Sequence, residues 1–173
     1  MLTKTDIEKY FIAEKKENLL FTILGIVAIA ISFTGLFYWK TPFWKGASIP
    51  LILIALIQII VGYTVFARSD KQRTNTVNAF DTDTSKLQNE ELPRMEEVNK
   101  NFATYRWTEI ILIVAGIALA LFYSANPDKQ FIVGIGVALA IEAALMFTAD
   151  LIAEKRAYNY SNGLKTFLQK QRM

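Results

Sequence analysis

Long apolar stretches alternate with charged segments along the 173-residue chain. Four stretches carry almost no charge and approach the ~20 residues that a helix needs to cross a hydrocarbon core of about 30 Å. The third is the weakest, because Glu109 interrupts it. The pattern predicts an all-α integral membrane protein whose four transmembrane helices occupy residues 19–39, 49–67, 107–124 and 131–151.

The charged segments beside these stretches also carry helical patterns. Residues 1–18 predict an amphipathic helix that begins with a capping box at Thr5 to Glu8, TDIE. Within the connection 68–106, the polar residues 75–91 predict a loop, whereas Pro93 opens a helix that continues into the third apolar stretch. We therefore expect one domain, residues 1–173, with helical extensions outside the membrane.

The last segment, residues 152–173, is a second amphipathic extension. We expect a break at Asn162-Gly163 and then a helix with Leu164, Phe167 and Leu168 on one face. Such a face can lie on the bilayer, cover the helical bundle or bind a partner. Contact with the membrane or with the protein itself is the simplest interpretation.

The distribution of basic residues predicts how the chain is threaded. Sixteen of the 19 lysines and arginines lie in the N-terminal arm, the middle connection and the tail, and only Lys40, Lys45 and Lys129 lie in the two short turns. By the positive-inside rule, both termini and the middle connection face the cytoplasm, as in a protein of the cytoplasmic (inner) membrane. The net charge of +3 follows from this threading, and no basic patch indicates nucleic-acid binding.

The apolar stretches pair as two hairpins that resemble each other weakly. A shift of 84 positions places Gln58 on Glu142 and Tyr63 on Phe147, and a shift of 92 places Glu17 on Glu109. Two hairpins that each run in, out and back would form a parallel 2+2 repeat. Apolar segments also match by chance, so chance similarity is the equal alternative.

The chain contains no cysteine and no histidine. This composition excludes thiolate nucleophiles, disulfide chemistry and metal or haem sites with imidazole ligands. No clustered acid, base or nucleophile motif indicates a lipid-modifying enzyme, and no carboxylate spacing indicates a metal site. We expect no enzymatic activity, no catalytic residue, no metal and no cofactor.

Two polar residues lie near the centres of apolar stretches. Gln58 shares a helix face with Ala55 and Gly62, a setting typical of an amide that bonds to a closely packed helix. Glu142 is more costly, because an ionised carboxylate at the membrane midplane must be protonated, paired or in contact with water. We expect it to be neutral unless water or a cation reaches it, and to exchange hydrogen bonds with Gln58.

Small residues mark the opposite face of the fourth stretch. Gly136, Ala140, Ala144 and Thr148 recur at intervals of four and form a close-packing surface. A helix with this stripe on one side and Glu142 on the other predicts a central position in the bundle. We expect the stripe, with Gly62 on the second helix, to pack helices together or to form the face of a homodimer.

The other carboxylates have simpler interpretations. We expect Glu17 and Glu109 at helix starts, where the helix dipole favours negative charge, and Asp150 within reach of Lys155 or Arg156. Asp150 lies about two helical turns from Glu142 and is kept as a candidate lining residue. Tyr63 is kept with Glu142, Gln58 and Asp150 as a candidate ligand or ion site because of its place in the repeat.

Two functions follow from these features. In the first, a non-enzymatic protein assembles in the lipid bilayer with itself or with a membrane partner. In the second, a small transporter or channel uses Glu142 and Gln58 to bind a proton, a cation or a small polar ligand. The substitution Glu142→Gln separates them, because it preserves shape for assembly and removes the charge that transport needs.

Overall fold

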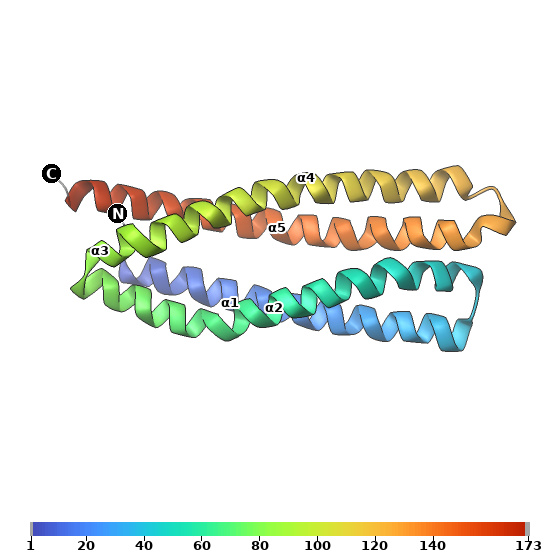
Figure 1. Ribbon diagram of the computed structural model, residues 1–173, viewed down its shortest axis with the longest axis horizontal. Coiled ribbons are helices and arrows are strands. Elements are labelled where there is room, and N and C mark those ends of the chain that lie inside the picture. The colour runs from blue at the N-terminus through green and yellow to red at the C-terminus, as the bar shows by residue number, and fades with distance from the viewer. Residues whose placement is uncertain (1, 172–173) are drawn as a thin grey trace.

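The computed structural model describes residues 2–171 and shows four long helices arranged as two hairpins (Figure 1). Each long helix is apolar and long enough to cross a membrane, which confirms the predicted all-α membrane architecture. The first hairpin pairs α1 with α2, the second pairs α4 with α5, and the hairpins join through α2 and α5. The long helices are α1 (Lys4–Thr34), α2 (Pro42–Thr82), α4 (Leu92–Tyr123) and α5 (Gln130–Gln171).

Short elements connect these helices. One π-helical turn, η1 (Gly35–Trp39), extends α1 before Lys40 reverses the chain in a left-handed conformation. The short helix α3 (Thr84–Lys86) and a second π-helical turn, η2 (Leu87–Glu91), link α2 to α4. A 3₁₀ turn, η3 (Pro127–Lys129), precedes α5.

The two longest helices are about twice as long as the hydrocarbon core of a membrane is thick. At about 1.5 Å per residue, α2 and α5 each span roughly 60 Å, against about 30 Å for a hydrocarbon core. We call residues 19–67 and 107–151 the membrane half, and residues 2–18, 68–106 and 152–171 the polar half. In Figure 1 the two chain ends and α3 lie together at the polar end, and the two tight turns lie at the other.

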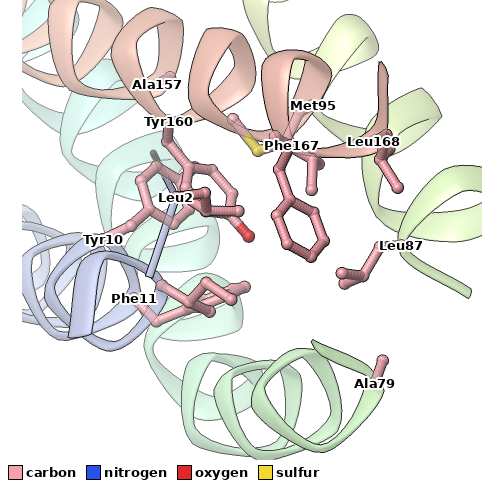
Figure 2. Close-up of a cluster of buried hydrophobic side chains, with 12 residues drawn as sticks. Leu2, Tyr10, Phe11, Ala79, Leu87, Met95, Ala157, Tyr160, Phe167 and Leu168 are labelled. Carbon is pink, nitrogen blue, oxygen red and sulfur yellow. The ribbon is translucent and has the colours of Figure 1, made fainter. Parts of the chain in front are cut away.

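The polar half has its own core of large side chains. Figure 2 shows Tyr10 and Phe11 of α1 pointing toward Tyr160 and Phe167 of α5. Tyr10 stacks on Tyr160 with ring centroids 4.3 Å apart, and Phe80 of α2 stacks on Phe167 at 4.7 Å. The buried face of the tail therefore covers the protein's own bundle, which is one of the interpretations the sequence allowed.

Three local predictions about the polar half are wrong. The expected loop 75–91 is mostly helix, because α2 continues to Thr82 and the chain turns at Asp83, whose side chain accepts from the Ser85 amide. The expected break at Asn162-Gly163 is absent, since α5 is continuous and the neighbouring Ser161 and Leu164 are buried. Packing of one helix face in each segment outweighs its polar composition.

The third correction concerns the start of α1. The capping residue is Thr3, whose hydroxyl accepts from the Asp6 amide at 3.2 Å while the Asp6 carboxylate accepts from the Thr3 amide at 3.0 Å. The predicted cap, Thr5, lies inside the helix. Starting at Thr3 brings Leu2 onto the aromatic core, which explains why the helix begins earlier.

Candidate functional site

The two mid-membrane polar residues meet in the structure. Gln58 of α2 donates a hydrogen bond from Nε2 to Oε2 of Glu142 of α5, at 3.2 Å. Both side chains are buried, with 5% and 6% of their surface exposed. The bond joins the two hairpins at the positions that the 84-residue shift pairs with each other.

Small residues beside Gln58 let α1 approach it closely. A Cβ atom added to Gly25 of α1 would lie 2.8 Å from the Ala55 carbonyl oxygen and 3.3 Å from the Gln58 Cβ. Gly62, one turn further along α2, lies against the Asn18 carbonyl oxygen of α1 in the same way. The expected close packing on this face is present, and α1 is the helix that uses it.

A groove of about 340 Å³ borders the pair, between α1, α2 and α5. Gln58 and Glu142 are the polar residues among its lining, which is otherwise aliphatic and aromatic and includes Phe21, Phe43 and Trp44. Several lining residues, such as Val27 and Ile141 at 47% and 54% exposed, lie on the outer surface of the helices. In a membrane, this groove therefore opens toward the hydrocarbon.

The hydrogen-bonding capacity of the pair is only partly used. Oε1 of Gln58 is buried and has no hydrogen-bond partner among residues 2–171. None of the four apolar segments contains a lysine or arginine, so these segments place no cation beside Glu142. The buried Oε1 is a free acceptor position, whereas one of the two N–H groups of the amide already donates to Glu142.

A second pair of carboxyl groups lies nearer the polar half, where α4 packs against α5. Glu109 of α4 and Asp150 of α5 face each other about one helical turn from the Arg106–Glu154 ion pair, which joins the same two helices. Glu109 is only 4% exposed, and Asp150 is half-buried. Of the two, Asp150 was a predicted site residue, whereas Glu109 was given only a structural role.

The predicted surroundings of these carboxylates are wrong. Glu17 and Glu109 lie inside long helices that begin at Lys4 and Leu92, so no helix dipole stabilises them. Arg156 binds Glu17 and is not the partner of Asp150. The hydropathy pattern marked where the apolar stretches begin, and the helices themselves begin much earlier.

Tyr63 does not join the site. Its side chain is 64% exposed and does not line the groove. Placement by the internal repeat alone is therefore a poor guide to which side chains share a site.

The small stripe of the fourth apolar segment is divided between two environments. A Cβ added to Gly136 would lie 2.6 Å from the Gly116 carbonyl oxygen, and one added to Gly116 would meet Ala140 at 2.7 Å. This part of the stripe packs against α4 of the same chain. Only Ala144 and Thr148 remain exposed.

A network of buried charges in the polar half was not anticipated. Arg94 donates two hydrogen bonds of 2.8 Å to the Glu91 carboxylate, which also accepts from the Tyr160 hydroxyl at 3.0 Å. Close by, the Tyr10 hydroxyl contacts Glu14, and burial raises the pKa of Glu14 against the opposing effect of Arg94. The i, i+3 spacing of Glu91 and Arg94 is the sequence signal that could have revealed part of this network.

Comparison with known protein families, curated proteins and solved structures finds no match to this chain. The candidate site is therefore argued from its own geometry.

Proposed function

We propose that this membrane protein binds an amphiphilic molecule that carries a cationic amine, in the groove beside Gln58 and Glu142. The observation that carries the proposal is the free acceptor position of Gln58 next to a carboxyl group that has no cationic partner among residues 2–171. A ligand at this place must supply a hydrogen-bond donor, and a positive charge would offset the cost of an ionised Glu142 in the membrane.

The groove suits the rest of such a ligand. Its apolar lining would cover a hydrocarbon chain or ring, and its opening toward the hydrocarbon gives access from the bilayer. The two hairpins, joined through α2 and α5, supply two bodies whose relative motion would turn binding into transport. We accordingly favour a small transporter over a channel.

Assembly with a second copy or a membrane partner is the second candidate function. It is favoured by Ala144 and Thr148, the part of the small stripe that α4 leaves exposed. It is weakened because Gly136, the residue that would allow the closest approach, is already covered by Gly116. We place assembly after ligand binding for this reason.

The remaining aspects of the proposal follow from composition. The absence of cysteine and histidine from the sequence supports a protein without enzymatic chemistry. The concentration of basic residues in the polar half supports a cytoplasmic location for both termini, in the cytoplasmic membrane of the cell.

Fluorescence quenching tests the proposed ligand. Trp44 lines the groove, so a brominated long-chain alkylamine bound there should quench its emission in vesicles of zwitterionic lipid. We expect saturable quenching in the wild type and loss of the saturable component in Glu142→Gln. A brominated alcohol of equal chain length, which lacks the charge, should quench both proteins equally.

Two further variants complete the test. Trp39 stacks on Trp44 with ring centroids 4.3 Å apart, so the combined variant Trp39→Phe and Trp44→Phe should remove the saturable signal and thereby assign it to the groove. Asp128→Asn removes an exposed carboxylate from the turn before α5 and should behave as the wild type, which controls for the loss of one charge. Equal amine binding by the wild type and Glu142→Gln would refute the proposal, and a dimer weakened by Ala144→Leu in native mass spectrometry would favour assembly.

A further inference from the structure

Glu109 faces another carboxyl group, that of Asp150, whereas Glu91 and Glu17 contact arginines and Glu142 contacts an amide. Both oxygens of Glu109 are buried, and neither has a hydrogen-bond donor among residues 2–171. Among residues 2–171, the neighbouring polar group is the Asp150 carboxyl, about one helical turn from the Arg106–Glu154 ion pair that sets the register of α4 against α5. Two ionised carboxylates cannot donate to each other, so the contact lacks a hydrogen as long as both are charged.

Neighbouring negative charges make it still less favourable for Glu109 and Asp150 to be ionised at the same time. Glu17 of α1 and Glu154 of α5 both add negative potential at Asp150. The arginines at this level are already bound, since Arg156 pairs with Glu17 and Arg106 of α4 donates to both oxygens of Glu154 at 2.9 and 3.1 Å. Among residues 2–171, no lysine or arginine forms an ion pair with Glu109 or Asp150.

Two types of cation can neutralise such a pair, a metal ion or a proton. Hard metal ions such as Ca²⁺ and Mg²⁺ take about six or more oxygen ligands, some of which can be waters, and a site at Glu109, which is 4% exposed, leaves little room for water. No group of three or more acidic, histidine or cysteine side chains in the described part of the chain is arranged to hold a metal. Two adjacent carboxyls that share one proton need no other ligand, as in pairs where like charges prevent both groups from ionising.

We propose that Glu109 and Asp150 form a proton-binding site, in which one carboxyl retains a proton and donates it as a hydrogen bond to the other. No covalent chemistry is involved: the proton enters from water and leaves to water. The site holds α4 against α5 while the proton is present. Loss of the proton leaves two negative charges between these helices, so their contact weakens as the pH rises.

This proton site is separate from the groove. Neither Glu109 nor Asp150 lines the groove, and Asp150 follows Glu142 on α5 by eight residues, about 12 Å along the helix. The inference therefore does not rest on the proposed ligand.

Infrared spectroscopy tests the proton site directly. A protonated carboxyl has a carbonyl stretching band that ionised carboxylates lack. The experiment uses the full chain in zwitterionic nanodiscs with Glu142→Gln and Glu14→Gln combined as the background, at neutral pH and above, so that neither the mid-membrane carboxyl nor the buried Glu14 carboxyl contributes. We expect a pH-sensitive carbonyl band in this background, and its complete loss when Glu109→Gln and Asp150→Asn are combined.

Matched variants and ions make the result decisive. Asp128→Asn, an exposed carboxylate in the same background, should leave the band unchanged, and circular dichroism checks that each variant remains helical. The proposal is overturned if the band persists in the combined variant, or if none appears in the background protein. Displacement of the titration by Na⁺, but not by choline at equal ionic strength, would assign the site to a metal cation and would also overturn it.

Discussion

In the polar half the helices meet around large side chains, whereas in the membrane half they meet through glycine and alanine. Ile7, Phe11 and Leu164 are at most 1% exposed at the centre of the polar half. In the membrane half, a Cβ added to Gly46 of α2 would lie 1.9 Å from the Phe131 carbonyl oxygen of α5. The same helices therefore use two modes of packing along their length.

The difference reflects the two solvents. In water, burial of large apolar side chains supplies the main driving force for helix association. In lipid that force is nearly absent, because the hydrocarbon chains are as apolar as leucine, and association depends on close backbone contact and on polar bonds such as that between Gln58 and Glu142. Large side chains in the membrane half consequently point outward, as Leu53 and Phe122 do at 59% and 83% exposed.

Charges follow the same division. In the polar half, Glu91 and Glu17 bind arginines. In the membrane half, Glu142 has an amide partner and Glu109 has another carboxyl. A buried charge without a partner is costly, so carboxylates kept in this state are the strongest candidates for function.

The largest expected difference in stability comes from replacing a leucine by alanine once in the polar half and once in the membrane half. Leu164→Ala, at a fully buried position of the polar half, should reduce the free energy of unfolding by about 2 to 5 kcal/mol. Leu121→Ala, at a position 69% exposed in the membrane half, should change it little because lipid replaces the lost contacts. Unfolding by dodecyl sulfate in mixed micelles measures both, and equal losses would contradict the two-solvent interpretation.

Replacing glycine by alanine tests the close helix contacts of the membrane half against an open position of the polar half. Gly46→Ala forces α2 away from α5 and should cost about 1 to 3 kcal/mol, as overpacking does elsewhere. Gly163→Ala in the polar half has its nearest neighbour, a Leu2 side-chain atom, at 3.4 Å and should stabilise α5 by about 0.5 to 1 kcal/mol. The same unfolding assay should give opposite signs, and a neutral Gly46→Ala would show that the hairpins separate freely.

The smallest expected effect concerns a carboxylate of the polar half. Burial raises the pKa of Glu14, so the folded protein favours its protonated form, and stability falls as the pH rises from the unfolded pKa through the folded one. Glu14→Gln should therefore match the wild type at low pH and be slightly more stable at neutral pH. Thermal unfolding followed by circular dichroism measures this difference in stability, with Glu8→Gln at an exposed position as the matched control. A Glu14→Gln variant that is less stable than the wild type at neutral pH would contradict the prediction.

Much of the fold could be predicted from the chain. The four apolar stretches predicted four membrane-length helices, and the shared face of Ala55, Gln58 and Gly62 indicated where another helix would pack. The contact between Gln58 and Glu142 was also expected, because a polar group in an apolar stretch requires a partner. The helical segment after Asp83 was not predicted, because its polar composition is typical of a loop. Its helical structure is evident only from the way it packs against the core.

The candidate site was predicted in part. Glu142, Gln58 and Asp150 were named in advance, whereas Tyr63 lies outside the site and Glu109 was given a structural role only. The reason is the length of the helices. Hydropathy shows where a membrane crossing begins, but it does not show that α4 begins 17 residues before Glu109, which removes the helix-dipole explanation for that carboxylate.

The class of the protein, its number of membrane-length helices and the scarcity of cations within them follow from the composition along the chain. Which carboxylates have partners depends on how the helices pack in three dimensions. Arg156 binds Glu17, and Asp150 is left to Glu109. Such pairings depend on distances between residues far apart in the chain, and the rotation and register of the packed helices set those distances.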